Sequence, residues 1–483
     1  MVMTILEKLK NTVLPDTEIL SVIYETAGKL DTPFGVHENL PNFYRVVLKM
    51  TPGTDSLIYT EVWLPEDWNG IFAGTGNGGI AGKVGYPWLA AFIRAGYAVA
   101  NTDMGTSRGA SSGIGNPDVW KDFGWRATHL MTTAAKELIL SCYGKPQSYS
   151  YFVGTSTGGQ QAMKEAQCFP EDYDGILAGV PANSRLDLHT YFLWNYVQMR
   201  TPEGLPLFTE DEIREISDFV TGFYQSRMDG QPGDQFVSMP QADEATIRAV
   251  LQGLQQAFPA LTDAQRNALE AVYRGPVEPD TGKQIYCGLP MGSEGYSGGL
   301  EIYIKEELHN YYPFIWAFGE EKVPMQFDFG KDWRYVKELL SEDMDADSVA
   351  LEPFFARGGK LLMYSGSVDP LVPFPKGIEY CDRLFARFGG SEALADRFRY
   401  YLLPGRNHGG NGKGYNFLCT ETLEPILPVL RRWREEGVEP GQLYGIHIPP
   451  EQTTQTMYQY TMEQAENMSS PTAIRPLQPY TGK

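Results

Sequence analysis

Residues 149–166 read Tyr-Ser-Tyr-Phe-Val-Gly-Thr-Ser-Thr-Gly-Gly-Gln-Gln-Ala-Met-Lys-Glu-Ala, and this stretch decides the fold. Its first five residues are mostly aromatic or β-branched, which predicts a buried strand. Its end, from Gln160 to Ala166, predicts a helix. Between them, Gly154-Thr155-Ser156-Thr157-Gly158 is a G-x-S-x-G sequence. Small residues at such a junction permit a strained turn from strand to helix that presents the serine hydroxyl.

The same pattern occurs four times in this glycine-rich chain, centred on Ser107, Ser111, Ser156 and Ser297. Ser107 and Ser111 share one loop, which no helical pattern follows. Ser297 lies in a Gly/Ser loop that no predicted strand precedes. Because the turn needs a strand before it and a helix after it, Ser156 is the candidate nucleophile.

Strand and helix patterns alternate on both sides of this stretch. Strands are predicted at 56–64, 71–73, 97–100, 360–364 and 398–403, and helices at 89–95 and 127–142. Such alternation indicates an α/β fold with a mostly parallel central sheet that helices cover on both faces.

The pattern becomes mainly helical between about residues 185 and 345. Capping boxes at Thr209–Glu212 and Thr262–Gln265 each open an amphipathic helix, and the second helix stops at Gly275. We therefore predict the first part of an α/β body at 1–184, an inserted lid domain at 185–345, and the second part of the body with a C-terminal tail at 346–483.

A serine hydroxyl needs a general base to act as a nucleophile, and histidine is the usual one. Of the six histidines, His408 follows the predicted strand 398–403 in a loop of small and polar residues. Asp369 follows the predicted strand 360–364. The order Ser156, Asp369, His408 is that of the catalytic triad in α/β-hydrolases. His189 and His309, at the edge of the lid or inside it, are interpreted as packing or surface residues.

The triad also needs an oxyanion hole, built from backbone N–H groups. One donor is predicted to be Thr157, the residue after the nucleophile, and the other Gly78, in the loop after an early strand. That loop, Gly74-Thr75-Gly76-Asn77-Gly78-Gly79, also satisfies the dinucleotide-binding pattern G-x-G-x-x-G. We favour the oxyanion interpretation because a triad fits the rest of the chain.

Charge and cysteine content limit the partners. The formal net charge of −20 argues against nucleic acid or an anionic membrane surface as a partner. No apolar run approaches the ~18–20 residues of a membrane span, and Glu7 to Asn11 interrupts any signal-peptide core. Five cysteines without a C-x-x-C pair indicate neither a disulfide framework nor a zinc site. We expect a cytoplasmic protein without cofactor or metal, although a secreted form and any oligomeric state remain open.

The chain resembles the tannase/feruloyl esterase family of α/β-hydrolases over nearly its whole length. The resemblance is carried by Glu61-Val62-Trp63-Leu64-Pro65, Trp68-Asn69-Gly70, Gly76-Asn77-Gly78-Gly79, Ser156-Thr157-Gly158-Gly159, Pro170-Glu171-Asp172-Tyr173-Asp174-Gly175, Pro181-Ala182-Asn183, Gly288-Leu289-Pro290, Arg357-Gly358-Gly359-Lys360, Asp369-Pro370-Leu371-Val372-Pro373 and Arg475-Pro476-Leu477. It implies a carboxylic ester hydrolase for small esters of aromatic acids, of the feruloyl, galloyl or chlorogenate type, bound between body and lid.

The chain departs from the family where the family has cysteines. Family members usually carry a disulfide between a cysteine before the nucleophile and one after the catalytic histidine, and here those positions are Thr155 and Gly409. Tyr44 and Gln478 also replace frequent family cysteines. A reducing compartment would select such losses, and the triad geometry would then depend on packing alone. Many relatives also bind calcium in a lid loop. The nearest segment here, 229–234, has few carboxylates, so we favour a surface turn over a calcium site and leave calcium binding as the alternative.

Two other functions remain open. The same triad serves an intracellular hydrolase or acyltransferase of a specialised metabolite, cleaving a lactone or a C–C bond, and a non-catalytic binding protein could retain the fold. The lid aromatics fit either a substrate pocket or a lid core: Tyr191, Phe192, Trp194, Tyr196, Tyr311, Tyr312, Phe314 and Trp316.

Overall fold

The computed structural model describes residues 3–227, 234–240, 243–305, 311–449 and 473–482. These residues form a nine-stranded central sheet in the order β1-β4-β5-β7-β6-β8-β9-β10-β11. The antiparallel end consists of β1 (Thr17–Glu25), β4 (Phe43–Met50) and β5 (Ile58–Pro65). The remaining strands run parallel: β7 (Ala98–Thr102), β6 (Ile71–Thr75), β8 (Tyr149–Thr155), β9 (Gly175–Gly179), β10 (Lys360–Gly366) and β11 (Phe398–Leu403). The predicted α/β-hydrolase fold is confirmed.

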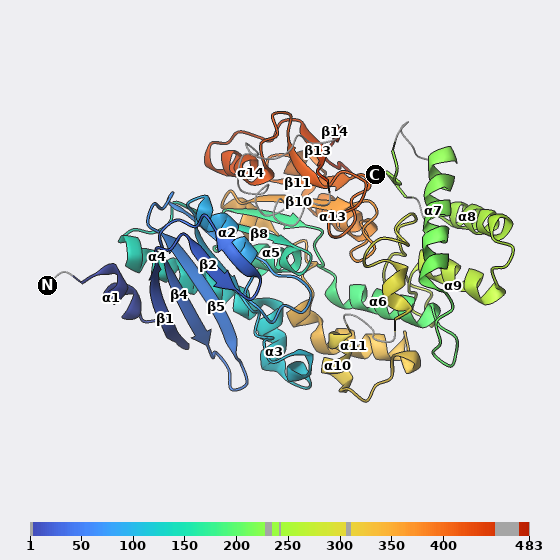
Figure 1. Ribbon diagram of the computed structural model, residues 1–483, viewed down its shortest axis with the longest axis horizontal. Helices are drawn as coiled ribbons and strands as arrows, with labels where there is room; N and C mark the ends of the chain where they lie inside the picture. The colour runs from blue at the N-terminus through green and yellow to red at the C-terminus, as the bar shows by residue number, and fades with distance from the viewer. Residues whose placement is uncertain (1–2, 228–233, 241–242, 306–310, 450–472, 483) are drawn as a thin grey trace.

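Helices cover both faces of the sheet (Figure 1). On one face α4 (Ala127–Tyr143), α5 (Thr157–Cys168) and α13 (Pro375–Phe388) pack against strand residues that include Ile176. On the other, α2 (Tyr86–Arg94) and α14 (Ile426–Glu435) pack against residues that include Leu177. Neighbouring residues of a strand point to opposite faces of the sheet. A strand that is apolar on both faces therefore contributes side chains to two separate hydrophobic cores.

Smaller elements complete the body. Helix α1 (Ile5–Lys10) lies beside α4, β2 (Lys29–Thr32) pairs with β3 (Gly35–Glu38), and α3 (Pro117–Lys121) and α12 (Glu352–Ala356) are short helices. A second sheet consists of β12 (Phe417–Thr420), β13 (Leu443–His447) and β14 (Ala473–Leu477). Part of the C-terminal tail is thus built into the fold, because β14 pairs with β13.

The chain between β9 and β10 is mainly helical and lies beside the body, at the right of Figure 1. Its helices are α6 (Arg185–Gln198), α7 (Glu210–Arg227), α8 (Glu244–Ala257), α9 (Asp263–Arg274), α10 (Tyr312–Phe318) and α11 (Lys331–Met344). The capping boxes at Thr209 and Thr262 are both present. Residues of this helical region form an apolar cluster with Val368 and Val372 of the body. The boundaries of the lid stay a prediction.

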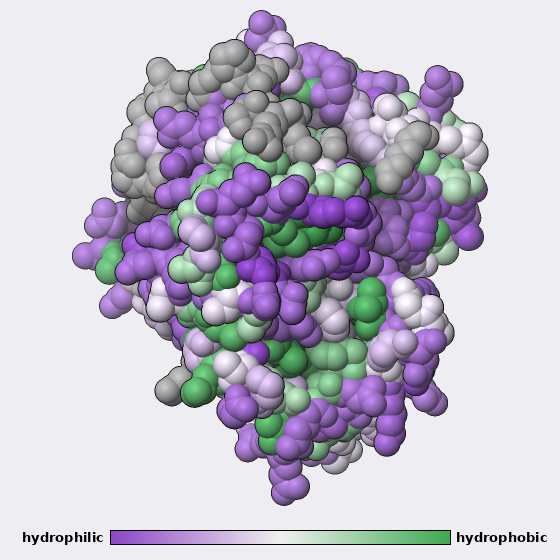
Figure 2. Space-filling view, turned by 90° about the vertical axis from the view of Figure 1, so that its right-hand side faces the viewer, coloured by the Kyte–Doolittle hydropathy of each residue, from purple (hydrophilic) through white to green (hydrophobic). Residues whose placement is uncertain are grey.

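The outer surface of the helical region is largely hydrophilic. Seen from the side of α7, α8 and α9, hydrophilic side chains predominate, and hydrophobic side chains gather near the middle of the face and at several places in its lower half (Figure 2). Such a surface agrees with the formal net charge of −20 and favours solubility.

A buried carboxyl group, that of Glu294, makes the stability of the protein depend on pH. Glu294 is fully buried, and its Oε1 accepts hydrogen bonds from Tyr273 Oη at 2.8 Å and from Gly292 N at 3.0 Å. Burial raises the pKa of Glu294 to about 7. Between the ordinary pKa of 4.5 and about 7, the unfolded chain releases this proton while the folded chain keeps it. The free energy of unfolding therefore falls as pH rises through this window.

Glu294→Gln removes this penalty, because the amide has the shape of the protonated acid. We expect the variant to be more stable than the wild type by about 3 kcal/mol at about pH 8 and equally stable at about pH 4. Thermal unfolding at both pH values measures the difference, with exposed Glu392→Gln as control. An equal effect of Glu294→Gln at both pH values would contradict this explanation.

Candidate active site

Ser156 occupies a strained turn between β8 and α5. Its φ of 60° and ψ of −117° are rare for a residue with a side chain. Backbone bonds hold the turn: Ser156 N donates to Gly179 O at 3.0 Å, and Ala182 N donates to Ser156 O at 3.1 Å. The strand-to-helix context predicted for Ser156 is therefore present.

Glycine is required where this turn is packed most tightly. A Cβ on Gly154 would lie 2.2 Å from Gly158 O, and a Cβ on Gly76 would lie 2.4 Å from Gly158 Cα. These are backbone atoms that cannot swing aside. The loop 76–79 consequently lies directly against the start of α5.

Gly76→Ala is expected to push this loop away from the serine. We expect a loss of about 1–3 kcal/mol in the free energy of unfolding and up to a ~100-fold loss in kcat. Denaturant unfolding and initial rates measure the two effects. Gly222→Ala is the matched control, since nothing lies within 4 Å of its added Cβ. Equal behaviour of the two variants would show that the close approach at Gly76 has no consequence.

The three residues predicted as a triad lie together at the carboxyl edge of the sheet. His408 Nδ1 lies 2.8 Å from Asp369 Oδ2, and His408 Nε2 lies 3.0 Å from Ser156 Oγ. The Asp369 side chain is fully buried, and its Oδ1 accepts hydrogen bonds from Leu371 N and Val372 N, both at 2.9 Å. Both carboxylate oxygens are thus fixed, which orients the imidazole toward the serine.

Hydrogen bonds from two buried asparagines, Asn407 and Asn416, brace the His408 loop. Asn416 Nδ2 donates to Gly410 O at 2.9 Å and to Ile448 O at 2.7 Å. Asn407 Oδ1 accepts from Asn411 N at 3.1 Å. The two buried amide side chains tie the loop to itself and to Ile448, and the expectation that the triad is held without a covalent link stays a prediction. The spacing of Asn407 and Asn416 along the sequence does not indicate this role, so it could not be predicted.

Thr157 and Gly78, the predicted oxyanion donors, line the same cavity as Ser156. Thr157 is the first residue of α5, where backbone N–H groups have no partner within the helix. Asn77 N donates to Gln161 Oε1 at 2.9 Å and is therefore engaged, while the role of Gly78 N as the donor of the loop stays a prediction. Thr157 Oγ1 also donates to Gly79 O at 2.7 Å and ties the loop to α5.

A cavity of about 420 Å³ opens at Ser156. Of the eight lid aromatics, Phe192 is the one found among its described lining residues, whereas Tyr191, Tyr196, Tyr312, Phe314 and Trp316 belong to apolar cores. Sequence reasoning did not single out Arg185 and Arg406, two charged residues among those that line the cavity. His189 packs edge-on against Phe192 and Tyr312, as predicted for a packing residue, and also lines the cavity. His309 lies outside the described residues.

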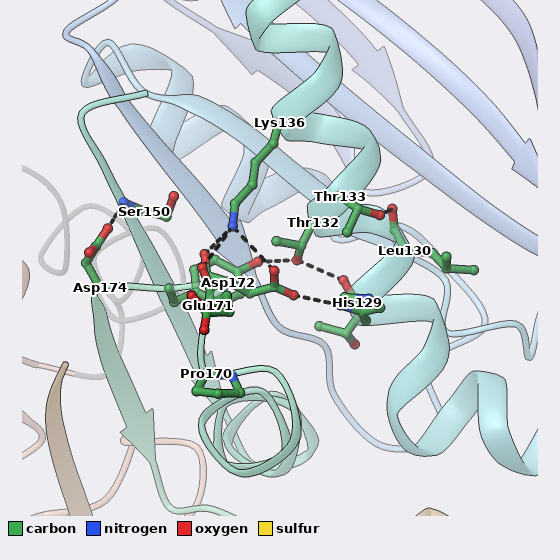
Figure 3. Close-up of polar contacts among 12 residues, drawn as sticks. His129, Leu130, Thr132, Thr133, Lys136, Ser150, Pro170, Glu171, Asp172 and Asp174 are labelled. Atoms are coloured by element: carbon green, nitrogen blue, oxygen red, sulfur yellow. Dashed lines mark hydrogen bonds and ion pairs between the residues drawn. The ribbon is translucent and has the colours of Figure 1, made fainter. Parts of the chain in front are cut away.

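A second polar cluster lies away from this cavity. His129, Glu165 and Asp172 bring potential metal ligands within 4.8 Å of one another. In Figure 3, Asp172 lies between His129 and Lys136: His129 Nδ1 is 2.7 Å from Asp172 Oδ2, and Lys136 Nζ donates to Asp172 O at 2.6 Å. Burial, with the nearby charge of Asp172, raises the pKa of Glu165 well above its usual range. We interpret the cluster as a tie between α4 and the loop after α5, with Lys136 as its cation.

Three further expectations concern cysteines, calcium and membranes. All five cysteines are free thiols.

Residues 229–233 of the candidate calcium loop lie outside the described residues. The last residue of that loop, Asp234, accepts a hydrogen bond from Arg475 Nη2 at 2.8 Å. No helix formed by the described residues is long and apolar enough to cross a membrane.

Comparison with known proteins shows to which family this sequence is similar. The model of the family "Tannase and feruloyl esterase" matches residues 44–304 and 320–467. An uncharacterised esterase of Xanthomonas campestris is 29% identical over 89% of this chain and 82% of its own length. Feruloyl esterase C of Talaromyces stipitatus is 27% identical over 85% of this chain and 79% of its own length.

Solved structures agree on the fold. The crystal structure of feruloyl esterase B from Aspergillus oryzae superposes with a TM-score of 0.83 at 23% identity, covering 99% of this chain and 96% of that one. Because the family model matches most of the sequence, the chain belongs to the tannase and feruloyl esterase family.

Proposed function

We propose that this protein is a serine carboxylic ester hydrolase that acts on small esters of aromatic acids through an acyl-enzyme at Ser156. The observation that carries the proposal is the chain of contacts from Asp369 to His408 at 2.8 Å and from His408 to Ser156 at 3.0 Å. Membership of the tannase and feruloyl esterase family supports the reaction class.

The proposed reaction has two halves. His408 takes the Ser156 proton as Oγ attacks the ester carbonyl, and Asp369 stabilises the imidazolium that forms. The N–H groups of Thr157 and Gly78 stabilise the oxyanion, each by about 3 kcal/mol. His408 then gives its proton to the leaving alkoxide. Water, activated by the same histidine, releases the acid from the acyl-enzyme.

Two observations support an aromatic acid as substrate. The cavity lies within the size range of small-molecule sites, and the rings of Trp88 and Phe192 contribute to its wall. Several relatives are named feruloyl esterases. The proposed reaction draws on no cofactor or metal, since Ser156, His408 and water supply every proton and bond.

We also propose that the enzyme works in the cytoplasm. The reducing conditions there explain why Thr155 and Gly409 stand at two positions that usually carry disulfide-bonded cysteines in the family. Because all five cysteines are free thiols, we expect an excess of dithiothreitol to leave kcat/KM unchanged. Initial rates with and without the reductant measure this. Inactivation by the reductant would contradict the proposal of a triad that needs no disulfide.

A substrate panel tests the proposed function. Purified protein is assayed with methyl ferulate, methyl gallate, chlorogenate and aryl lactones, alongside the Ser156→Ala variant. We expect wild-type hydrolysis of at least one aromatic ester that Ser156→Ala does not catalyse. Cleavage of the lactones alone, or equal rates with both proteins, would overturn the proposal.

A further inference from the structure

The loop after β6 is bound to α5 on both sides of Gly78. On one side, Asn77 N donates to Gln161 Oε1 at 2.9 Å, and Gln161 Nε2 donates to Asn77 Oδ1 at 3.3 Å. On the other side, Thr157 Oγ1 donates to Gly79 O at 2.7 Å. Thr157 and Gln161 are four residues apart and therefore lie on the same face of α5. Two side chains of one helix thus hold the two neighbours of Gly78.

Gly78 itself makes few contacts that could fix its position. The residue is exposed, and apart from its chain neighbours no atom of the described residues lies within 4 Å of a Cβ built on it. Glycine also has the widest choice of backbone conformations. An oxyanion donor, in contrast, must stay within about 0.5 Å of its productive position. The position of the predicted donor, Gly78 N, therefore depends on how Asn77 and Gly79 are held.

Further hydrogen bonds make Asn77 a fixed point of the loop. Asn77 O accepts from Gly158 N at 2.7 Å. Asn77 Nδ2 donates to Thr102 O at 2.8 Å and to Asn101 Oδ1 at 3.1 Å. Asn101 is fully buried, and its Nδ2 donates to Thr75 O at 2.8 Å. Asn77 thus connects α5 with β7 and, through Asn101, with β6.

Gln161 holds Asn77 from outside the cavity. It is 1% exposed and is not among the described residues that line the cavity at Ser156. Its Nε2 also donates to Thr128 Oγ1 at 2.8 Å, which anchors the side chain on α4. Both amide atoms of Gln161 are thus engaged in hydrogen bonds. A side chain fixed in this way needs no rearrangement when charge develops on the substrate.

We propose that Gln161 is a positioning residue of the oxyanion hole, which acts through Asn77 on the Gly78 N–H group. The Thr157 side chain acts on the same group through Gly79. This inference rests on the proposed esterase function and deepens it. Because the oxyanion forms only as the reaction proceeds, loss of these ties lowers kcat and leaves KM almost unchanged.

Gln161→Met gives the first test, because methionine is close to glutamine in size but makes neither bond to Asn77. We expect kcat on an aromatic ester to fall about 10–100-fold, with KM within about threefold of the wild-type value. Gln167→Met is the matched control. Gln167 lies on the same helix, and its Nε2 donates to a backbone oxygen, that of Ala346, at 2.7 Å. It should lose stability but keep wild-type kcat. Equal kcat in the two variants would overturn the proposal.

Thr157→Val decides the question if Gln161→Met does not fold. Valine has the shape of threonine and keeps the backbone N–H of residue 157, but it cannot donate to Gly79 O. We expect kcat to fall about tenfold, the effect of one neutral hydrogen bond. Thr157→Ser, which restores the hydroxyl, should recover most of this loss. Wild-type kcat in Thr157→Val would overturn the proposal, and so would an equal loss in Thr157→Ser.

The rate at which a fluorophosphonate labels Ser156 keeps this inference distinct from the proposed function. The reagent needs no ester substrate, and its phosphoryl oxygen gains negative charge in the same oxyanion hole as Ser156 attacks. We expect labelling of Gln161→Met to be about tenfold or more slower than that of the wild type, and Gln167→Met to react at the wild-type rate.

The outcomes separate the two proposals. If the wild type is labelled at Ser156 but hydrolyses no aromatic ester, the esterase proposal fails, and the labelling rates still decide the role of Gln161. Equal labelling rates in the wild type and Gln161→Met would overturn the positioning role. A wild type that is not labelled at Ser156 would overturn both proposals.

Discussion

Ser156→Ala is expected to lower kcat on an aromatic ester by about 10⁴–10⁶-fold, the loss found when a serine hydrolase loses its nucleophile. His408 and the oxyanion donors remain, but no atom is left to form the acyl-enzyme. Binding contacts are intact, so KM should change little. Initial rates over a range of substrate concentrations give both parameters, and circular dichroism checks the fold.

The matched control is Ser297→Ala, because Ser297 is the centre of another G-x-S-x-G sequence and is exposed. It should retain wild-type kcat and KM. A loss of less than tenfold in Ser156→Ala, or an equal loss in Ser297→Ala, would show that Ser156 has been misassigned.

Asp369→Asn is expected to lower kcat by about 10⁴-fold, as the equivalent change does in serine proteases. The contacts of Asp369 explain why. Oδ1 accepts from two backbone amides, so an asparagine must keep its oxygen there and turn its NH₂ group toward His408 Nδ1. The imidazole then carries its proton on Nε2 and cannot accept one from Ser156.

The measurement for Asp369→Asn is kcat as a function of pH. Activity should recover partly at high pH, where hydroxide replaces the missing base. Asp396→Asn, at a side chain 58% exposed, serves as control and should behave as the wild type. Retention of more than a tenth of wild-type kcat by Asp369→Asn would contradict the assigned role.

The parallel half of the fold could be predicted from sequence because its strands are short, apolar runs. β8 and β10 are buried on both faces, so their composition alone distinguishes them from loops. The antiparallel edge could not be predicted in the same way. β1 is at the edge, only partly buried and irregular near Ile19, so its polar residues mask the strand pattern. β13 and β14 depend on pairing between distant segments, which no local window contains.

The triad could be predicted because each member follows a strand in the order typical of the fold. The presence of Arg185 and Arg406 in the lining of the cavity at Ser156 could not be predicted. Arg185, the first residue of α6, lies in the lining because a contact between distant segments, its hydrogen bond to Gln160 of α5, holds it there. Arg406 stands two residues before His408, in a loop whose shape depends on Asn416.

Trapping the acyl-enzyme tests the central claim most directly. The protein is treated with a fluorophosphonate, digested and analysed by mass spectrometry, with residual esterase activity followed in parallel. One adduct per chain is expected on the peptide that contains Ser156, with loss of activity at the same rate and no adduct in Ser156→Ala. Labelling of another serine, or full activity in a completely labelled Ser156 protein, would contradict the account.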